Sequence, residues 1–216
     1  MKVLGITGGI GSGKSTVCMI FKTLGVPVFS SDEVSKSILF SSDTQKDVSN
    51  IFGDIVLKDG LLDKKRLGDY IFSNESALKS LNKLLHPRVG KAFQVWKEQQ
   101  NSFFVIKEAA ILFESGADKY CDFVVNVSCN EGDRIKRVLK RDNRTESEIK
   151  SIIKKQWDEN KRVKYSDFII NNESEKLIPQ VLNLFFRLKK KFYKFWHFLR
   201  FSFNLIVNNL FLYLHE

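Results

Sequence analysis

Proline, cysteine and histidine are scarce in this 216-residue chain, which contains three of each. With so few prolines and no low-complexity tract, the chain has little room for a disordered linker. The cysteines (Cys18, Cys121 and Cys129) form no CxxC pair and lie in or beside apolar segments, which predicts buried free thiols rather than a disulfide framework or a zinc site. We find no internal repeat and no signal-peptide pattern. These absences predict a cytoplasmic protein with one folded domain, with or without inserted lobes.

Charge is unevenly balanced along the chain. Lysine and arginine number 35 against 25 acidic residues, a formal net charge of +10. This excess favours anionic partners such as nucleotides, nucleic acid or a membrane surface. Six of the basic residues lie after residue 186, so the global charge is poor support for nucleic-acid binding. We therefore predict no nucleic-acid partner.

Short apolar runs alternate with helical patterns along the chain. Such alternation predicts a parallel sheet of about five strands that is covered by helices on both faces. The predicted strands are Val3–Ile6, Val26–Phe29, Phe103–Ile106, Phe123–Val127 and Phe168–Ile170.

Two helical blocks interrupt this alternation. The first, about residues 33–100, contains no convincing strand, and we expect a break at His86-Pro87 because the residue before proline is disfavoured in a helix. The second covers about residues 132–164, where Thr145 and Glu148 have capping-box spacing. Helices expected in the first block are Asp32–Phe40, Thr44–Phe52, Lys64–Phe72 and a long one from Glu75.

The stretch GITGGIGSGKST stands between the first predicted strand and a predicted helix, and it satisfies the phosphate-loop (P-loop) pattern. Its glycines let successive backbone N–H groups point at a phosphate, and the following helix adds its positive end. Lys14 then reaches the outer phosphates, and Ser15 offers its hydroxyl to Mg²⁺. We therefore predict a three-layer α/β P-loop NTPase fold that binds ATP and Mg²⁺. The predicted nucleotide-binding residues in the loop are Gly11, Ser12, Gly13, Lys14, Ser15 and Thr16.

Other classes of P-loop protein fit this sequence less well. No aspartate is followed by glycine three places on and there is no NKxD motif, which disfavours a GTPase. The strand Phe103–Ile106 is followed by Lys107 and Glu108 rather than by the aspartate expected of a motor ATPase. A small kinase remains, with ATP at one end and a phosphate acceptor in the helical insertion.

Two carboxylates follow predicted strands at the sheet edge where ligands bind in this architecture. Asp32 can orient an acceptor hydroxyl and take its proton, and the competing interpretation is an N-cap for the helix Glu33–Phe40. Glu108 can hold the water shell of Mg²⁺ or an acceptor hydroxyl, or else form a structural ion pair.

Three arginines in the second helical block share one face of a helix. Arg134, Arg137 and Arg141 have helical spacing, and the plain interpretation is a solvated basic face. In a small kinase such a face belongs to a lid whose closure expels water and brings guanidinium charge to the transferring group. We predict a lid over residues 132–164, with Arg141 as its catalytic residue.

An ordered set of motifs makes the sequence resemble the dephospho-CoA kinase family over about residues 1–185. The set consists of TGGIGSGKST, an aspartate just after the second strand, LLHP, ILFE, KRD and INN. The resemblance implies transfer of the ATP γ-phosphate to the 3′-hydroxyl of dephospho-coenzyme A, the last step of CoA synthesis. One departure lies before ILFE, where the family commonly has aspartate and proline and this chain has Glu108-Ala109-Ala110.

The resemblance also implies roles for particular residues. Asp32 is then the proposed base, while Lys14 and Arg141 neutralise phosphates. Asn171 or Asn172 lies in the loop near the adenine. The insertion with His86 shapes the acceptor pocket, where His86 either contacts the acceptor or serves as a structural helix breaker. Asp32, His86 and Glu108 are the predicted acceptor-binding residues.

The family usually ends soon after the helix Leu177–Leu188, whereas this chain continues. We therefore divide it into a kinase domain, residues 1–188, and a basic, aromatic extension, residues 189–216. In the extension, apolar residues at alternating steps of four and three form one helical face opposite a polar stripe, so a membrane span is disfavoured. A membrane surface, a protein contact and no specific role all remain open for it.

Two alternative functions remain open from the sequence alone. One is a P-loop kinase of another small acceptor, such as a nucleoside or nucleotide. The other is a membrane- or nucleic-acid-associated protein that uses ATP as a switch.

Overall fold

The structure is a computed structural model that describes residues 1–173 and 176–192. Its centre is a five-stranded sheet in the order β2-β5-β1-β6-β7, and every neighbouring pair is parallel. The predicted α/β class and five-stranded parallel sheet are confirmed. The strands are β1 (Lys2–Thr7), β2 (Val28–Ser30), β5 (Phe104–Glu108), β6 (Phe123–Ser128) and β7 (Phe168–Asn171).

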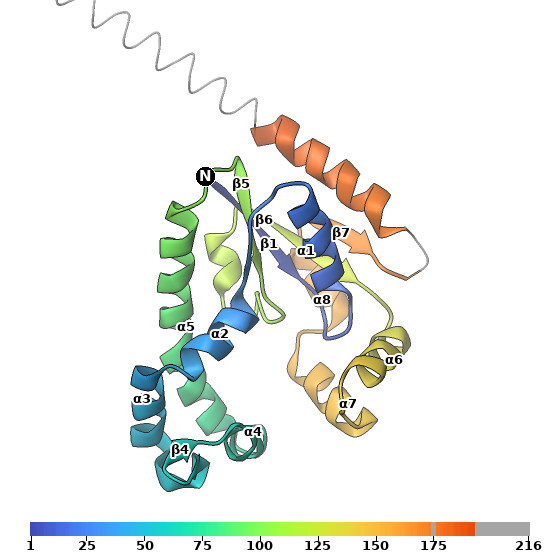
Figure 1. Cartoon of the computed structure of the whole chain (residues 1–216). Helices are drawn as coiled ribbons and strands as arrows, with labels where there is room; N and C mark the ends of the chain where they lie inside the picture. Colours follow the sequence, from blue (N-terminus) through green and yellow to red (C-terminus); the bar gives the residue numbers. More distant parts are fainter. Residues whose placement is uncertain (174–175, 193–216) are drawn as a thin grey trace, which may run out of the picture.

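Helices cover both faces of the sheet, which explains why its strands are apolar almost throughout (Figure 1). On one face, the core joins β1 side chains to α1 (Lys14–Thr23) and to a C-terminal helix over residues 177–192. On the other face, β1 and β5 pack against α5 (Glu75–Glu98). The result is a three-layer arrangement with β1 in the middle of the sheet.

The helix α5 runs without a break through Pro87, so the predicted interruption at His86-Pro87 is wrong. Proline removes one backbone donor from a helix, but burial of one continuous apolar face can outweigh that loss. Leu81 and Leu85 before the proline, and Val89 and Phe93 after it, are all buried on the α5 face. This packing on both sides keeps the two halves in one helix.

The insertion between β2 and α5 has its own small core around Val48, Val56 and Leu67. The expectation that it contains no strand is wrong at one point. Two strands of two residues each form a short hairpin, with Asp59 and Gly60, both with positive φ, at its turn. Asp-Gly is the common sequence of such a turn. The elements of the whole insertion are α2 (Ser31–Leu39), α3 (Ser42–Phe52), the 3-10 helix η1 (Gly53–Val56), β3 (Leu57–Lys58), β4 (Leu61–Leu62) and α4 (Lys64–Ser73).

A second helical block lies between β6 and β7. The capping box expected at Thr145 is confirmed, since Thr145 and Glu148 cap each other's backbone N–H groups. The helices of this block are α6 (Glu131–Arg141), α7 (Glu146–Lys155) and α8 (Glu159–Tyr165). A short 3-10 helix, η2 (Ala117–Tyr120), precedes β6 and lies outside the block. Figure 1 shows α3, β4 and α4 of the first block, and α6 and α7 of the second, beyond the carboxyl end of the sheet strands, while α5 runs alongside the sheet.

The three cysteines are free, with Cys18 and Cys129 buried and Cys121 half-buried, as expected for structural thiols. Of the predicted extension, residues 193–216 lie outside the described residues. Within residues 1–173 and 176–192, no helix has the length and hydropathy needed to cross a bilayer.

Candidate active site

The loop between β1 and α1 has the backbone that its glycines predict. Gly8, Gly11 and Gly13 have φ of 153°, 78° and 95°, values that residues with a side chain rarely adopt. Space also requires glycine at position 13, where a Cβ atom would lie 2.1 Å from the side-chain nitrogen of Asn172. The strand, loop and helix therefore have the arrangement that exposes backbone N–H groups to a phosphate.

Lys14 begins α1 and turns back over this loop. Its Nζ donates to the carbonyl oxygens of Gly8, at 3.0 Å, and Gly9, at 3.4 Å, and the residue is buried. Burial lowers the pKa of Lys14, while the charges of Glu108 and Asp32 act in the opposite direction. The lysine thus lies within electrostatic reach of both predicted carboxylates.

Glu108 ends β5 next to Ser30 of β2 in the register of the sheet. The Ser30 hydroxyl donates to Glu108 Oε2 at 3.1 Å. Burial raises the pKa of Glu108, the charge of Lys14 opposes that rise, and the charge of Asp32 adds to it. Glu108 therefore faces the P-loop lysine. It does not line the neighbouring hollow between α2 and α5.

Asp32 lies in the first turn of α2, so its interpretation as the N-cap of a helix that begins at Glu33 is wrong. The helix begins one residue earlier, at Ser31, with Ser30 at the N-cap. A carboxylate in the first turn still interacts favourably with the helix dipole. Its side chain lines a hollow beside the sheet.

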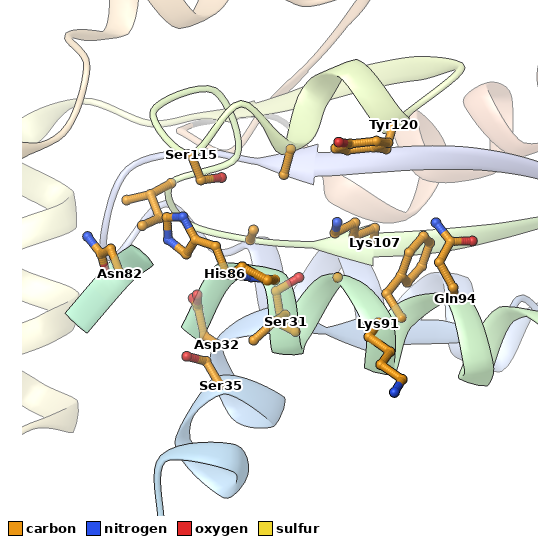
Figure 2. A pocket seen from close by; sticks show the side chains of 17 residues that line it. Ser31, Asp32, Ser35, Asn82, His86, Lys91, Gln94, Lys107, Ser115 and Tyr120 are labelled. Atoms are coloured by element: carbon orange, nitrogen blue, oxygen red, sulfur yellow. The ribbon is translucent and has the colours of Figure 1, made fainter. Parts of the chain in front are cut away.

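The hollow has a volume of about 560 Å³ and lies between the start of α2, the middle of α5 and the segment 109–120. Figure 2 shows Asp32, His86 and Lys107 around it. His86 is exposed at the rim of the hollow, and its pKa is lowered by partial desolvation and, secondly, by the charge of Lys107. Two of the predicted acceptor-binding residues, Asp32 and His86, are thus brought together from elements about fifty positions apart.

Asn171, the last residue of β7, and Asn172, which follows it, have different surroundings. The Asn172 side-chain nitrogen donates to the Ser12 carbonyl oxygen at 2.7 Å, and Arg137 Nη2 donates to the Asn172 carbonyl oxygen at 2.8 Å. Asn171 instead exchanges two backbone hydrogen bonds with the side chain of Gln180 in the C-terminal helix. Asn172 therefore contacts the P-loop directly, whereas Asn171 anchors the strand end.

Two buried arginines that the sequence did not single out for catalysis lie against the loop. Arg134 and Arg162 are 5% and 1% exposed, and a Cβ atom on Gly9 would contact both guanidinium groups. Arg162 is held by Glu159 at 2.7 Å and by the Trp157 carbonyl oxygen. Nε and Nη1 of Arg134 are buried without a hydrogen-bond partner in the described part of the chain.

Arg141, the arginine predicted to be catalytic, lies at the far end of α6. Its side chain is 61% exposed and makes two hydrogen bonds to Asp142, at 2.8 and 3.0 Å. Arg134 and Arg141 lie two turns apart on α6, so Arg134 contacts the P-loop while Arg141 lies near solvent. The sequence shows the common helical face but not which turn of it meets the loop.

The described residues contain no cluster of three or more histidine, cysteine or acidic side chains that could hold a metal ion. Ser15 lies in the first turn of α1 with an exposed side chain, so its hydroxyl is accessible. One hydroxyl beside a phosphate site fits Mg²⁺, which is usually bound through few protein ligands and substrate phosphates.

Comparison with known sequences gives one family. The sequence model of the dephospho-CoA kinase family matches residues 2–177. A dephospho-CoA kinase of Bacteroides fragilis is 36% identical over 191 residues, which cover 87% of this chain and 93% of the relative. That of Fusobacterium nucleatum is 34% identical over 173 residues, covering 80% of this chain and 90% of the relative.

Comparison with solved structures agrees. A dephospho-CoA kinase from Campylobacter jejuni has a TM-score of 0.65 and 26% identity, over 88% of this chain and 99% of that one. A structure from Thermus thermophilus, at 24% identity, shares the fold with a TM-score of 0.78 over 88% of this chain and 97% of that one. With its P-loop and the match over residues 2–177, the chain belongs to the dephospho-CoA kinase family, the ATP-dependent phosphotransferases that complete coenzyme A biosynthesis.

Proposed function

We propose that this chain transfers the γ-phosphate of Mg²⁺-bound ATP to the 3′-hydroxyl of dephospho-CoA, with Asp32 as the base. The observation that supports this most directly is the position of Asp32. Its carboxylate lines the hollow beside α5, and its charge also acts on Lys14 of the P-loop. A hydroxyl bound in the hollow then lies beside the terminal phosphate of a nucleotide bound by the loop.

On the nucleotide side, the backbone N–H groups of Gly11–Thr16 surround the β- and γ-phosphates, and Asn172 fixes the loop from behind. Lys14 exchanges its present carbonyl acceptors for phosphate oxygens. Mg²⁺, when bound at the Ser15 hydroxyl, neutralises charge on the phosphates and orients them. Glu108, half-buried beside Ser30, balances the charge of Lys14.

On the acceptor side, Asp32 accepts the proton of the 3′-hydroxyl while the oxygen of that hydroxyl forms a bond to the γ-phosphorus. The bond from that phosphorus to the bridging oxygen breaks, and ADP leaves with the electron pair. His86 borders the ribose as a neutral donor or acceptor, because its pKa is lowered.

Charge that develops on the phosphoryl group requires cations, and the arginines of the second helical block provide them. Arg134 and Arg162 supply buried guanidinium groups at the loop, where unpaired donors of Arg134 remain for phosphate oxygens. Arg141 joins them when the lid, about residues 132–164, closes. In this proposal residues 1–188 form the kinase domain, and residues 33–100 form its acceptor-binding insertion.

The test is a coupled assay of ADP release with purified protein, ATP, Mg²⁺ and a panel of acceptors. We expect turnover with dephospho-CoA and little with adenosine, other nucleosides or nucleoside monophosphates. Turnover of nucleosides without turnover of dephospho-CoA would contradict the proposal. When Mg²⁺ is left out of the assay, the protein should show no turnover with any acceptor.

A further inference from the structure

Lys107 is a buried charged residue that follows the apolar residues of strand β5 and precedes Glu108, the last residue of the strand. It stands in β5 after Val105 and Ile106, which are fully buried, and is itself 5% exposed. Its register partners are Gly5 on β1 and Phe29 on β2. Since alternate residues of a strand point to opposite faces, Lys107 lies on the α5 side, away from Glu108.

The surroundings of its ammonium group are aromatic rather than acidic. Nζ lies 4.7 Å from the ring centre of Phe93 and 5.9 Å from that of Tyr120. Within residues 1–173 and 176–192, no carboxylate forms an ion pair with it. Burial lowers the pKa of Lys107, and only the Cys121 thiol acts to raise it. Ring contacts compensate part of the desolvation of a buried cation, but an anion compensates far more.

The lysine also lines the hollow that contains Asp32. Figure 2 shows Lys107 under the Tyr120 ring, with Ser31 and Asp32 on the same hollow. The hollow therefore presents a carboxylate for a hydroxyl and, further along, a buried cation that has no carboxylate partner in the described part of the chain. A ribose whose 3′-hydroxyl faces Asp32 carries its 5′-substituent beyond the ring, and in dephospho-CoA that substituent is a diphosphate.

We propose that Lys107 binds the 5′-diphosphate of the acceptor and makes the hollow selective for diphosphate-bearing nucleosides over plain ones. This inference rests on the proposed function. Because the ammonium group is held between aromatic rings, it forms the ion pair with little loss of side-chain freedom. The contact does not involve the reacting atoms, so it stabilises the bound acceptor and the transition state equally.

The experiment compares Lys107→Met with Lys107→Arg and with the matched control Lys97→Met. Lys97 lies over the same Phe93 ring, at 5.9 Å, but does not line the hollow. We expect Lys107→Met to raise the KM for dephospho-CoA by about 10- to 100-fold with little change in kcat or in the KM for ATP. Lys107→Arg should retain most of the affinity, and Lys97→Met should stay within about twofold of the wild type.

Two further measurements exclude a merely structural role. Calorimetric affinity for adenosine, which lacks the diphosphate, should be the same in wild type and Lys107→Met. The free Lys107→Met protein should also unfold at a higher temperature than the wild type, because an unpaired buried charge has been removed. An unchanged KM for dephospho-CoA, or an equal loss for adenosine, would overturn the inference. A wild-type protein that makes no CoA would instead contradict the proposed function.

Discussion

The side chain of Asn172 donates a hydrogen bond to the carbonyl oxygen of Ser12 across 160 positions of sequence, at 2.7 Å. The bond joins the end of the outermost described strand of the sheet to the middle of the P-loop. Arg137 holds the Asn172 backbone in turn, at 2.8 Å. The P-loop is therefore held in place by residues outside the loop: Asn172, which follows β7, and Arg137, which lies on α6.

Replacement of Asn172 by alanine should weaken ATP binding more than acceptor binding. The Ser12 carbonyl loses its side-chain partner, and such a loss costs about 1–3 kcal/mol where water cannot replace it. We expect the KM for ATP to rise by about tenfold, with the KM for dephospho-CoA changed less than twofold. The control Gln180→Ala removes hydrogen bonds to the neighbouring Asn171 and to the Lys176 carbonyl oxygen, and none of these involves the P-loop. Equal effects of the two variants on ATP would contradict this role.

Gly13→Ala should damage the P-loop in two ways. The residue has φ of 95°, and a Cβ atom would lie 2.1 Å from the Asn172 nitrogen. Strain of this kind costs about 1–3 kcal/mol, and the displaced loop should lose measurable ATP binding in calorimetry. Gly25→Ala is the matched control, since Gly25 has φ of 80° with no atom within 4 Å of its Cβ position. That variant should lose about 1 kcal/mol of stability and bind ATP normally.

Asp32→Asn should reduce kcat by on the order of 10²-fold or more, because the amide keeps the shape but cannot accept the proton. Steady-state kinetics with saturating ATP and dephospho-CoA measures the loss, and calorimetry should show that ATP binding is retained. Glu33→Gln, at the exposed next position of α2, is the control and should keep full activity. Normal turnover by Asp32→Asn would exclude it as the base.

Stability should fall as the pH is lowered through the range where unfolded histidine titrates. Partial desolvation, with the charge of Lys107, lowers the pKa of His86 in the folded protein. The unfolded chain, with a histidine pKa of about 6.5, then binds more protons than the folded one. Stability should therefore decline below about pH 6.5 and level off below the folded pKa. Thermal unfolding from pH 8 to 5 measures this decline, which should be smaller in His86→Gln; an identical decline would contradict it.

Much of the fold was predictable because its signals are local. The apolar runs around Val3–Ile6 and Phe123–Val127 give the strands, and the glycines before Lys14 give the loop, since both depend on near neighbours in sequence. The helix α5 was not predictable in the same way. Its continuity through Pro87 depends on Leu85 and Val89 packing against other elements, which a local proline rule ignores.

The site was predictable only in part, for a related reason. Asp32 follows a strand directly, so its position at the sheet edge could be inferred, whereas the choice among Arg134, Arg137 and Arg141 depends on how α6 packs on the loop. Lys107 did carry a signal, a single lysine in a run of buried residues. Its meaning required the positions of Phe93 and Tyr120, which lie on α5 and η2 and meet the lysine only when these elements pack against β5.

The chemical identity of the product tests the proposed phosphoryl transfer most directly. Purified protein is incubated with ATP, Mg²⁺ and dephospho-CoA, and the products are separated and examined by mass spectrometry and ³¹P NMR. We expect one coenzyme A with a 3′-phosphate monoester for each ADP formed, and a near-complete loss of that product with Asp32→Asn. ADP that accumulates without coenzyme A, or a phosphate attached at another position, would contradict the proposed transfer.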